Sequence, residues 1–135
     1  MGIILLAIGS AFVGIASVIH LVIFYLESVA WSKPATWKRF GLRSQEDAEV
    51  ARPMAFNQGY YNAFLALAGI VGIILVSTPG LQQAGITLAL YSTLSMLLAA
   101  TVLITSNPKL ARAAVTQGAA PLVAVIFIAL ALFVS

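Results

Sequence analysis

Residues 3–31 read IILLAIGSAFVGIASVIHLVIFYLESVAW, and this stretch decides the fold. Its only His, Asp, Glu, Lys or Arg side chains are His20 and Glu27. It exceeds the roughly 20 apolar residues that a helix needs to cross a hydrocarbon core. Three further apolar runs follow, at residues 54–76, 83–105 and 113–134. The sequence therefore predicts an all-α fold, an integral membrane four-helix bundle that forms a single transmembrane domain over residues 1–135.

The composition excludes an ordinary water-soluble domain. Of the 135 residues, 61% are hydrophobic and 8% are charged, whereas a soluble domain carries about 25% charged residues. The chain has no cysteine, which excludes disulfides, thiolate metal ligands and cysteine nucleophiles. Its pI of about 9.6 indicates attraction to anionic lipids rather than to nucleic acid, because the basic residues lie in loops and not on a helix with interleaved aromatic residues.

The basic residues orient the predicted bundle. Five of the seven Lys and Arg side chains lie in residues 32–52, and the other two are Lys109 and Arg112. The segment between the second and third apolar runs carries none. Since basic loops stay on the cytoplasmic side, we expect the loops after the first and third spans to be cytoplasmic and both chain termini to be extracytoplasmic.

Residues 32–52 form the one sizeable polar segment, which we interpret as a cytoplasmic loop. Ser44-Gln45-Glu46-Asp47 resembles an N-cap box, in which a serine accepts a backbone N–H bond and an acidic residue follows three positions later. The second helix can therefore begin near Gln45 and enter the membrane past Pro53. A segment that merely connects two spans is the alternative. Three aromatic residues in and beside the segment are expected to be interfacial anchors: Trp31, Trp37 and Phe40.

Polar side chains inside the predicted spans indicate a pocket, because burying them in lipid costs free energy. His20 and Glu27 are seven residues apart, so they share one helix face and lie about 10 Å apart along the axis. Counting inward from the basic loops at about 1.5 Å per residue gives two layers. The layer nearest the cytoplasm contains Glu27, Gln58 and Gln117. The deeper layer contains His20, Tyr61, Asn62 and Ser95. The amides share faces with small residues, which mark helix–helix contacts, so we predict a hydrophilic pocket near the cytoplasmic side.

Each polar residue also has a structural interpretation. Glu27 lies close enough to the interface to pair with Lys33 or Arg52. His20 fits a hydrogen-bonded structural residue as well as a functional one. The amide side chains can link helices through hydrogen bonds worth about 0.6 kcal/mol each. These alternatives remain open on the sequence alone.

Three stretches carry a family resemblance. The first contains His20-Leu21, Tyr25-Leu26-Glu27 and Trp31; the second reads NQGYYNAFLA over residues 57–66; the third reads QGAAP over residues 117–121. Together they resemble the bacterial family known as domain of unknown function 1304, small four-span inner-membrane proteins with corresponding motifs in helices 1, 2 and 4. The proline of the third stretch lies one place later than in the family pattern. The resemblance implies a bacterial cytoplasmic (inner) membrane location and points to the same polar residues, including Asn57, but it implies no activity.

Three functions remain open. The first is a transporter or permease-like protein, in which Glu27 carries a proton, His20 is a second relay position, and the amides of Gln58, Asn62 and Gln117 hold the solute. An intramembrane carboxylate beside a histidine is the chemistry expected of proton coupling. Four helices are few for an alternating-access path, so we expect a homo-oligomer.

The second function is an intramembrane enzyme that uses His20 and Glu27 as an acid–base pair. The cofactor is unknown: metal chemistry is possible but poorly supplied, since His20 and Glu27 are only two firm ligands, and a haem held by His20 from two protomers is a variant. The third function is a non-catalytic accessory subunit that binds a lipid, a quinone or a partner helix. All three place the chain in the lipid bilayer with a small-molecule ligand or partner, and none involves nucleic acid.

Overall fold

The computed structural model describes residues 1–134 as helices joined by short turns. Within that range, four helical segments are long and apolar enough to cross a membrane, which confirms the predicted all-α, four-span architecture. The long helices are α1 (Gly2–Phe24), α3 (Gln45–Val76), α4 (Gln82–Ser106) and α5 (Ala111–Phe133). The short elements are a π-helical turn η1 (Tyr25–Val29), α2 (Pro34–Trp37) and the 3-10 turns η2 (Lys38–Phe40) and η3 (Pro108–Leu110).

The helix boundaries follow the sequence signals closely, with one informative difference. The predicted N-cap is confirmed: Ser44 Oγ accepts a hydrogen bond of 3.0 Å from the backbone N–H of Asp47, and α3 begins at Gln45. The first span ends at Val29, two residues before the expected Trp31, because Ala30 leaves the helical conformation (φ −98°, ψ 11°). That early end places Trp31 in a turn, where its ring can fold back onto α3.

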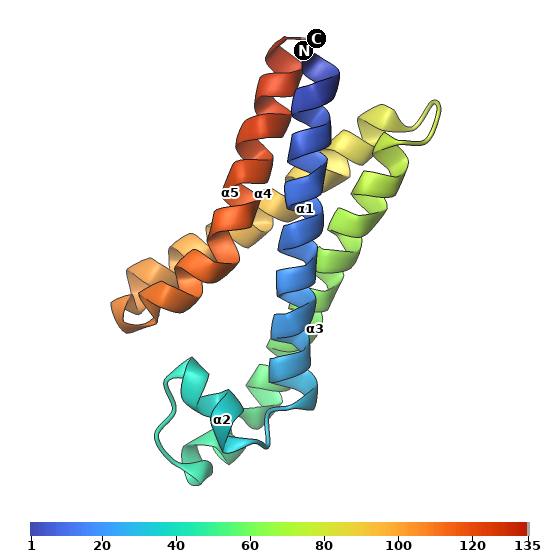
Figure 1. Cartoon of the computed structure of the whole chain (residues 1–135). Coiled ribbons are helices and arrows are strands. Elements are labelled where there is room, and N and C mark those ends of the chain that lie inside the picture. The colour runs from blue at the N-terminus through green and yellow to red at the C-terminus, as the bar shows by residue number, and fades with distance from the viewer. Residues whose placement is uncertain (135) are drawn as a thin grey trace.

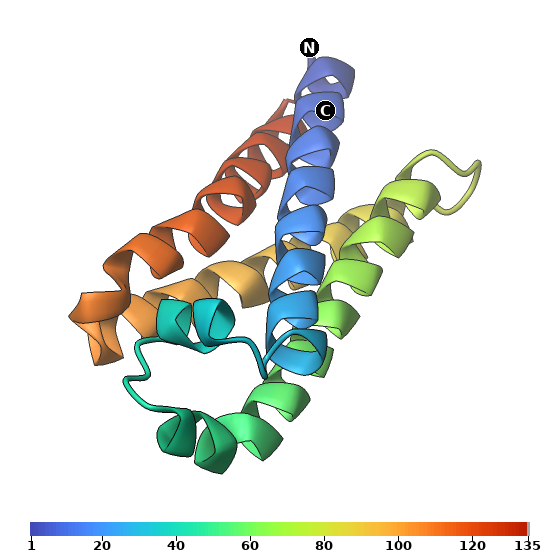
Figure 2. The same ribbon diagram turned by 60° about the horizontal axis from the view of Figure 1, so that its bottom comes forward.

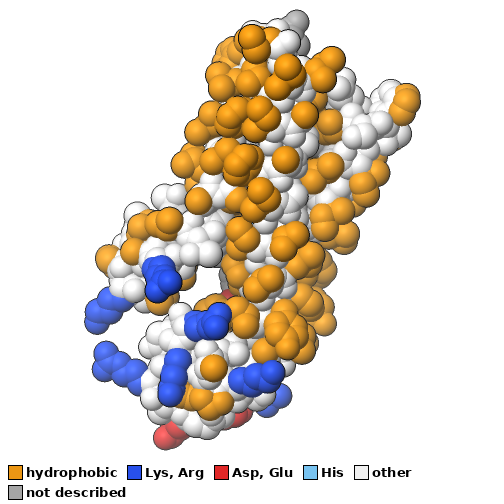
Figure 3. All heavy atoms as spheres, viewed as in Figure 1, with side chains coloured by type: hydrophobic (Ala, Val, Ile, Leu, Met, Phe, Trp, Pro, Cys, Tyr) orange, Lys and Arg blue, Asp and Glu red, His pale blue; other side chains and the backbone are white. Residues whose placement is uncertain are grey.

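The four long helices form a splayed bundle (Figures 1 and 2). Helix α1 packs against α3 and α5, and α4 packs against the same two helices from the other side. Both termini lie together at one end of the molecule, and α2 lies at the opposite end (Figure 1). Figure 3 shows the Lys and Arg side chains gathered at the end away from the termini. Charge is therefore segregated along the long axis of the bundle.

The bundle core lies toward the end that carries the termini. It consists of branched and small apolar side chains from three of the long helices: Val13, Ile86, Ala89, Ala124 and Ile128. A smaller cluster continues it toward the middle of the bundle, formed by Ala16, Met96 and Ala120. Each cluster contains two alanines, and small residues let helix backbones approach closely. This half of the bundle is consequently closed by side-chain packing.

A further core cluster lies at the basic end, and it includes two of the aromatic residues that we expected to be interfacial anchors. Trp31 and Trp37 pack with Ala48 and Ala55 of α3, and the two tryptophans are 7% and 4% exposed. The indole Nε1 of Trp31 donates a hydrogen bond of 2.8 Å to the Ala48 carbonyl oxygen. We expected these rings to be interfacial anchors at headgroup depth; they are buried against α3 because the segment before that helix folds back, and their depth in the membrane stays a prediction. Residues 31–55 thus form a packed lobe, not a mere connection.

Candidate functional site

Glu27 occupies the π-helical turn η1 at the end of the first span. The turn is closed by a hydrogen bond of 2.9 Å from the Ala30 N–H to the Tyr25 carbonyl, one residue wider than in an α-helix. Such π-turns are rare and occur frequently at functional sites. The Glu27 side chain is 8% exposed. The turn thereby holds an acidic side chain inside the protein at the level where the helix ends.

Helix α3 rests directly on this turn because position 59 is a glycine. A Cβ at Gly59 would collide with Ser28 Oγ and would lie 3.1 Å from Glu27 Cβ and 3.2 Å from the Phe24 carbonyl oxygen. The Ser28 hydroxyl is itself fixed, since it donates a hydrogen bond of 2.9 Å to the Phe56 carbonyl oxygen. The contact between η1 and α3 therefore depends on the missing side chain.

Asn62 supplies the hydrogen-bond partner of the buried carboxylate. Its Nδ2 donates to Glu27 Oε2 at 2.9 Å and also to the Gln58 carbonyl oxygen of its own helix at 3.1 Å. The two side chains were expected in different layers. The amide reaches back toward the end of the first span, so the structure joins one residue of the deeper layer to one of the layer nearest the basic end.

Glu27 has no cationic partner among the described residues. Arg52, one of the two partners considered from the sequence, lies 3.7 Å from Glu49 instead (Nη1 to Oε2). Lys33, the other, is exposed and forms no ion pair within residues 1–134. The interpretation of Glu27 as a surface carboxylate paired with a loop cation is therefore wrong for this structure.

The carboxylate faces a cavity of about 370 Å³ at the basic end of the bundle. Its polar lining consists of Glu27, Asn57 and Gln58. The apolar lining comes from the turn after the first span and from the start of α3: Trp31, Phe40, Leu42, Ala51, Met54 and Ala55. Figure 3 shows the molecule hollowed on this side, between the lobe of residues 31–55 and the end of the α4–α5 hairpin. The cavity combines one acid, two amides and aromatic walls.

The other predicted pocket residues lie elsewhere. Tyr61 is 54% exposed and does not line the cavity. Gln117 is half-buried on α5, also outside the cavity. His20 is 1% exposed, and its Nδ1 donates a hydrogen bond of 2.9 Å to the Ala16 carbonyl oxygen one turn earlier. Of the seven predicted residues, the structure gathers Glu27, Asn57 and Gln58 in the cavity and attaches Asn62 through the carboxylate.

This placement weakens the catalytic and cofactor alternatives. His20 and Glu27 share no hydrogen bond in the described chain, and His20 is not part of the cavity wall. An imidazole that is 1% exposed presents no ligand for a haem shared between two protomers. No three metal-binding side chains (His, Cys, Asp or Glu) gather anywhere in residues 1–134. Among the described residues, the site offers a carboxylate, two amides and aromatic rings.

The apolar cavity residues were missed from the sequence although a signal for them existed. Ala51, Met54, Ala55 and Gln58 recur at i, i+3, i+4 and i+7, which is one helix face. Only Ala51 of this face lies before the predicted span of residues 54–76, and the apolar residues were missed because the site was predicted from polar side chains alone. Trp31 follows Glu27 by four residues, but only the turn at Ala30 brings its ring into the wall. No periodicity could have indicated that turn.

Comparison with known proteins adds a family without an activity. A family model described as Protein of unknown function (DUF1304) matches residues 14–129, a range that contains every residue lining the cavity. No curated protein matches the chain. No solved structure matches it either.

Proposed function

Because the chain belongs to the family of proteins of unknown function DUF1304, its activity has to be inferred from its own residues, and we propose that it is a permease-like membrane protein. In this proposal the cavity around Glu27 binds a small solute, and the whole chain is a single transmembrane domain in a bacterial cytoplasmic membrane. The basic end faces the cytoplasm, in keeping with the retention of basic loops there, and both termini face outward.

One observation carries the proposal: a carboxylate is buried against a cavity with no cation beside it. Removing a charge from water costs several kcal/mol, roughly, unless it is paired and hydrogen-bonded. Asn62 supplies one hydrogen bond to Glu27, and within the described residues no ion pair offsets the charge. Ionisable groups inside membrane spans mark solute or proton pathways. Glu27 is thus suited to bind a proton or a cationic solute that enters the cavity.

The cavity walls favour an amine-bearing solute. The rings of Trp31 and Phe40 lie 5.3 Å apart between centroids and are tilted by 52°, and both line the cavity. Aromatic faces attract ammonium groups, most strongly when water is excluded. The amides of Asn57 and Gln58 add donors and acceptors for a polar substituent. We therefore propose a small organic cation, exchanged against a proton on Glu27.

Transport requires a second conformation, in which the cavity is accessible from the opposite end of the bundle. The cavity lies at the basic end, and packed side chains of the cluster around Val13 and Ile128 close the opposite half. Alternating access then requires one helix pair to move against the other. Helices α1 and α4 pack little on each other, and each packs mainly against α3 and α5, so such a movement has to slide along the contacts with α3 and α5. A homo-oligomer would supply the stationary partner for this movement.

A second candidate function, an accessory subunit that binds a quinone or a lipid without transport, is favoured by one observation. Six of the nine residues that line the cavity are apolar or aromatic: Trp31, Phe40, Leu42, Ala51, Met54 and Ala55. A neutral ring with one or two carbonyls would fit these walls and bond the amides. Under this alternative the Glu27 charge is not needed for binding.

The test compares two carboxylate variants in proteoliposomes. Benzylammonium and tetramethylammonium serve as probes, with binding followed by tryptophan emission, since Trp31 lines the cavity, and uptake followed with radiolabelled probe under an imposed pH gradient. We expect Glu27→Gln to lose at least about tenfold in binding (about 1.4 kcal/mol) and all gradient-driven uptake. The matched control is Glu49→Gln, which removes an exposed carboxylate from the same end of the molecule and should behave as the unmodified protein.

Glu27→Gln should still fold, because its amide oxygen can accept the Asn62 hydrogen bond and a buried charge is removed. Equal binding and uptake by the unmodified protein and Glu27→Gln would overturn the proposal. Tight binding of ubiquinone-1 by both proteins, with no amine binding by either, would favour the accessory subunit.

A further inference from the structure

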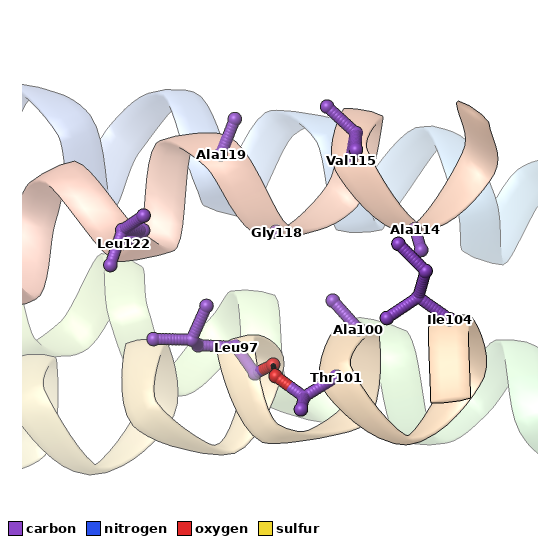
Figure 4. Close-up of a pocket in the computed structure, with 9 residues that line it drawn as sticks. All are labelled: Leu97, Ala100, Thr101, Ile104, Ala114, Val115, Gly118, Ala119 and Leu122. Carbon is purple, nitrogen blue, oxygen red and sulfur yellow. Dashed lines mark hydrogen bonds between the residues drawn. The ribbon is translucent and has the colours of Figure 1, made fainter. Parts of the chain in front are cut away.

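A second hollow lies between α4 and α5, away from the Glu27 cavity. It has a volume of about 260 Å³. Its lining residues, labelled in Figure 4, come from both helices: Leu97, Ala100, Thr101 and Ile104 on α4, and Ala114, Val115, Gly118, Ala119 and Leu122 on α5. Ala100, Ile104 and Ala114 lie between the helices, whereas Val115 and Ala119 point away from α4 (Figure 4). None of these residues lines the cavity around Glu27. The groove is a separate feature of the molecule.

The groove offers hydrocarbon contact and almost nothing else. Its one polar side chain, Thr101, donates its hydroxyl hydrogen to the Leu97 carbonyl of its own helix at 2.9 Å, so the methyl group is left as its outward contact. Ala119 leaves room on α5 where a larger side chain would fill the space, and Gly118 lets α5 approach Ala100 of α4 closely. An occupant of this groove must be an apolar chain or ring.

Two cations stand at one end of the groove. Lys109 and Arg112 are exposed in and just after the turn that joins α4 to α5, and Figure 3 shows basic side chains at the end of this hairpin. Val115, Ala119 and Leu122 follow Arg112 at i+3, i+7 and i+10, so all four share one face of α5. The guanidinium therefore belongs to the same stripe as the groove wall.

These cations lack acidic partners in the chain. The four acidic residues of the sequence are Glu27, Glu46, Asp47 and Glu49, and none follows position 49. Within residues 1–134 neither Lys109 nor Arg112 takes part in an ion pair. The hairpin thus presents two uncompensated positive charges next to an apolar groove.

We propose that the α4–α5 groove binds one acyl chain of an anionic phospholipid, whose phosphate contacts Lys109 and Arg112. The dimensions agree: the ten residues from Arg112 to Leu122 span about 15 Å along a helix, which is about half of a hydrocarbon core roughly 30 Å thick, or one leaflet. Basic pockets between membrane helices are known to recognise anionic lipid headgroups. The lipid-binding proposal requires only the four-span membrane architecture, so it does not depend on the function proposed for Glu27.

The experiment is native mass spectrometry of the full chain released from bilayer discs of phosphatidylglycerol and phosphatidylcholine with identical acyl chains. We expect one phosphatidylglycerol to be retained over phosphatidylcholine by about tenfold. The double variant Lys109→Gln with Arg112→Gln should lower that preference at least fivefold. The matched control, Lys33→Gln with Arg43→Gln, removes two exposed charges elsewhere in the chain and should leave the preference unchanged.

A second pair of variants tests the groove itself. Ala119→Phe should fill it and abolish retention of either lipid, whereas Ala99→Phe, an exposed alanine of α4 that does not line the groove, should not. Position 119 is chosen over Gly118, where a Cβ would lie 2.8 Å from Ala100 Cβ and force the helices apart.

Three outcomes would overturn the proposal. One is undiminished preference in the Lys109 and Arg112 double variant. Another is an equal loss in the Lys33 and Arg43 control, which would mean general attraction to the basic end. The third is a change in oligomeric state with Ala119→Phe while lipid retention stays constant, which would identify the groove as a contact between two copies of the chain.

Discussion

Asn62 Nδ2 lies 2.9 Å from Glu27 Oε2 across the contact between the first span and α3. The two residues are 35 positions apart in the sequence, and their hydrogen bond is the direct side-chain link between the buried carboxylate and α3. It sets the orientation of the acid toward the cavity, and it is accompanied by a close backbone approach at Gly59 and by the Ser28 hydrogen bond to the Phe56 carbonyl. Each of these contacts can be tested by substitution.

The Asn62–Glu27 hydrogen bond should be measurable as a coupling energy. Asn62→Ala removes the donor, and we expect it to lower the free energy of unfolding by about 0.6–1.7 kcal/mol, the average and the upper end for hydrogen bonds between membrane helices. Combined with Glu27→Gln in a double-mutant cycle, the two changes should be non-additive by at least about 0.5 kcal/mol. Unfolding in mixed micelles by denaturing detergent provides the measurement.

The exposed pair Gln45 and Glu49 is the matched control for that cycle. Gln45 Nε2 donates to Glu49 Oε1 at 2.8 Å on the surface of α3, so this pair has the same chemical groups at a similar distance but is exposed and lies within one helix. The cycle of Gln45→Ala and Glu49→Gln should give a coupling below about 0.5 kcal/mol. Equal coupling in both pairs would show that burial adds nothing to the Asn62–Glu27 contact.

Gly59→Ala should push α3 away from the turn that carries Glu27. The new Cβ cannot be accommodated by rotating Ser28 alone, because Ser28 would lose its hydrogen bond and the Phe24 carbonyl would still lie 3.2 Å away. We expect a loss of about 1–3 kcal/mol, as for other overpacked contacts. Loss of the Glu27 cavity should follow, detected as altered Trp31 emission.

Gly14→Ala gives the control for this substitution. A Cβ at Gly14 would meet only Ile73 Cδ1, at 3.7 Å, which is ordinary contact. Alanine favours a helix over glycine by about 1 kcal/mol, so Gly14→Ala should leave stability unchanged or raise it slightly. A larger loss at position 14 than at position 59 would contradict the packing described for η1.

The two tryptophans of the lobe should respond differently to the same change. Trp31→Phe removes an indole N–H that donates to the Ala48 carbonyl, whereas Trp37 Nε1 is buried without a hydrogen-bond partner. Both variants lose similar ring volume. We expect Trp31→Phe to be the more destabilising by about 1 kcal/mol, the net value of one hydrogen bond.

Amide hydrogen exchange over residues 33–44 provides the measurement for the tryptophan pair. Protection in this segment should fall in Trp31→Phe more than in Trp37→Phe, because the lobe is attached to α3 through the Trp31 ring. Equal exchange in the two variants would show that ring packing alone holds the lobe.

Ser44→Ala should fray the start of α3 without affecting the rest of the bundle. The serine hydroxyl caps the Asp47 N–H, and losing such a cap costs about 1 kcal/mol. Exchange of the amides of residues 46–48 should therefore quicken several-fold. Ser77→Ala, at the other end of the same helix, removes a weak 3.4 Å bond to the Ile73 carbonyl and should leave those amides unchanged.

Much of the fold could be predicted because its signals are local. Apolar length determines the four spans, and the cap at Ser44 is a four-residue pattern whose donor and acceptor belong to the same turn. The polar residues of the cavity could also be predicted from the sequence, since Glu27, Asn57 and Gln58 are polar side chains in an apolar chain. These features need no knowledge of which helices are neighbours.

The sequence by itself determined the number of spans, the segregation of charge to two segments and the polar residues available to a site. The tertiary structure alone decided which of them meet. Periodicity gives the face of a helix but not its rotation against a neighbour, so Tyr61 and Gln117 fell outside the cavity that Gln58 lines. The π-helical turn Tyr25–Val29 carries Glu27, which accepts the Asn62 hydrogen bond. The chain reverses direction after Ala30, and this reversal buries Trp31 against α3. Those outcomes depend on packing between segments far apart in the chain, which no local pattern encodes.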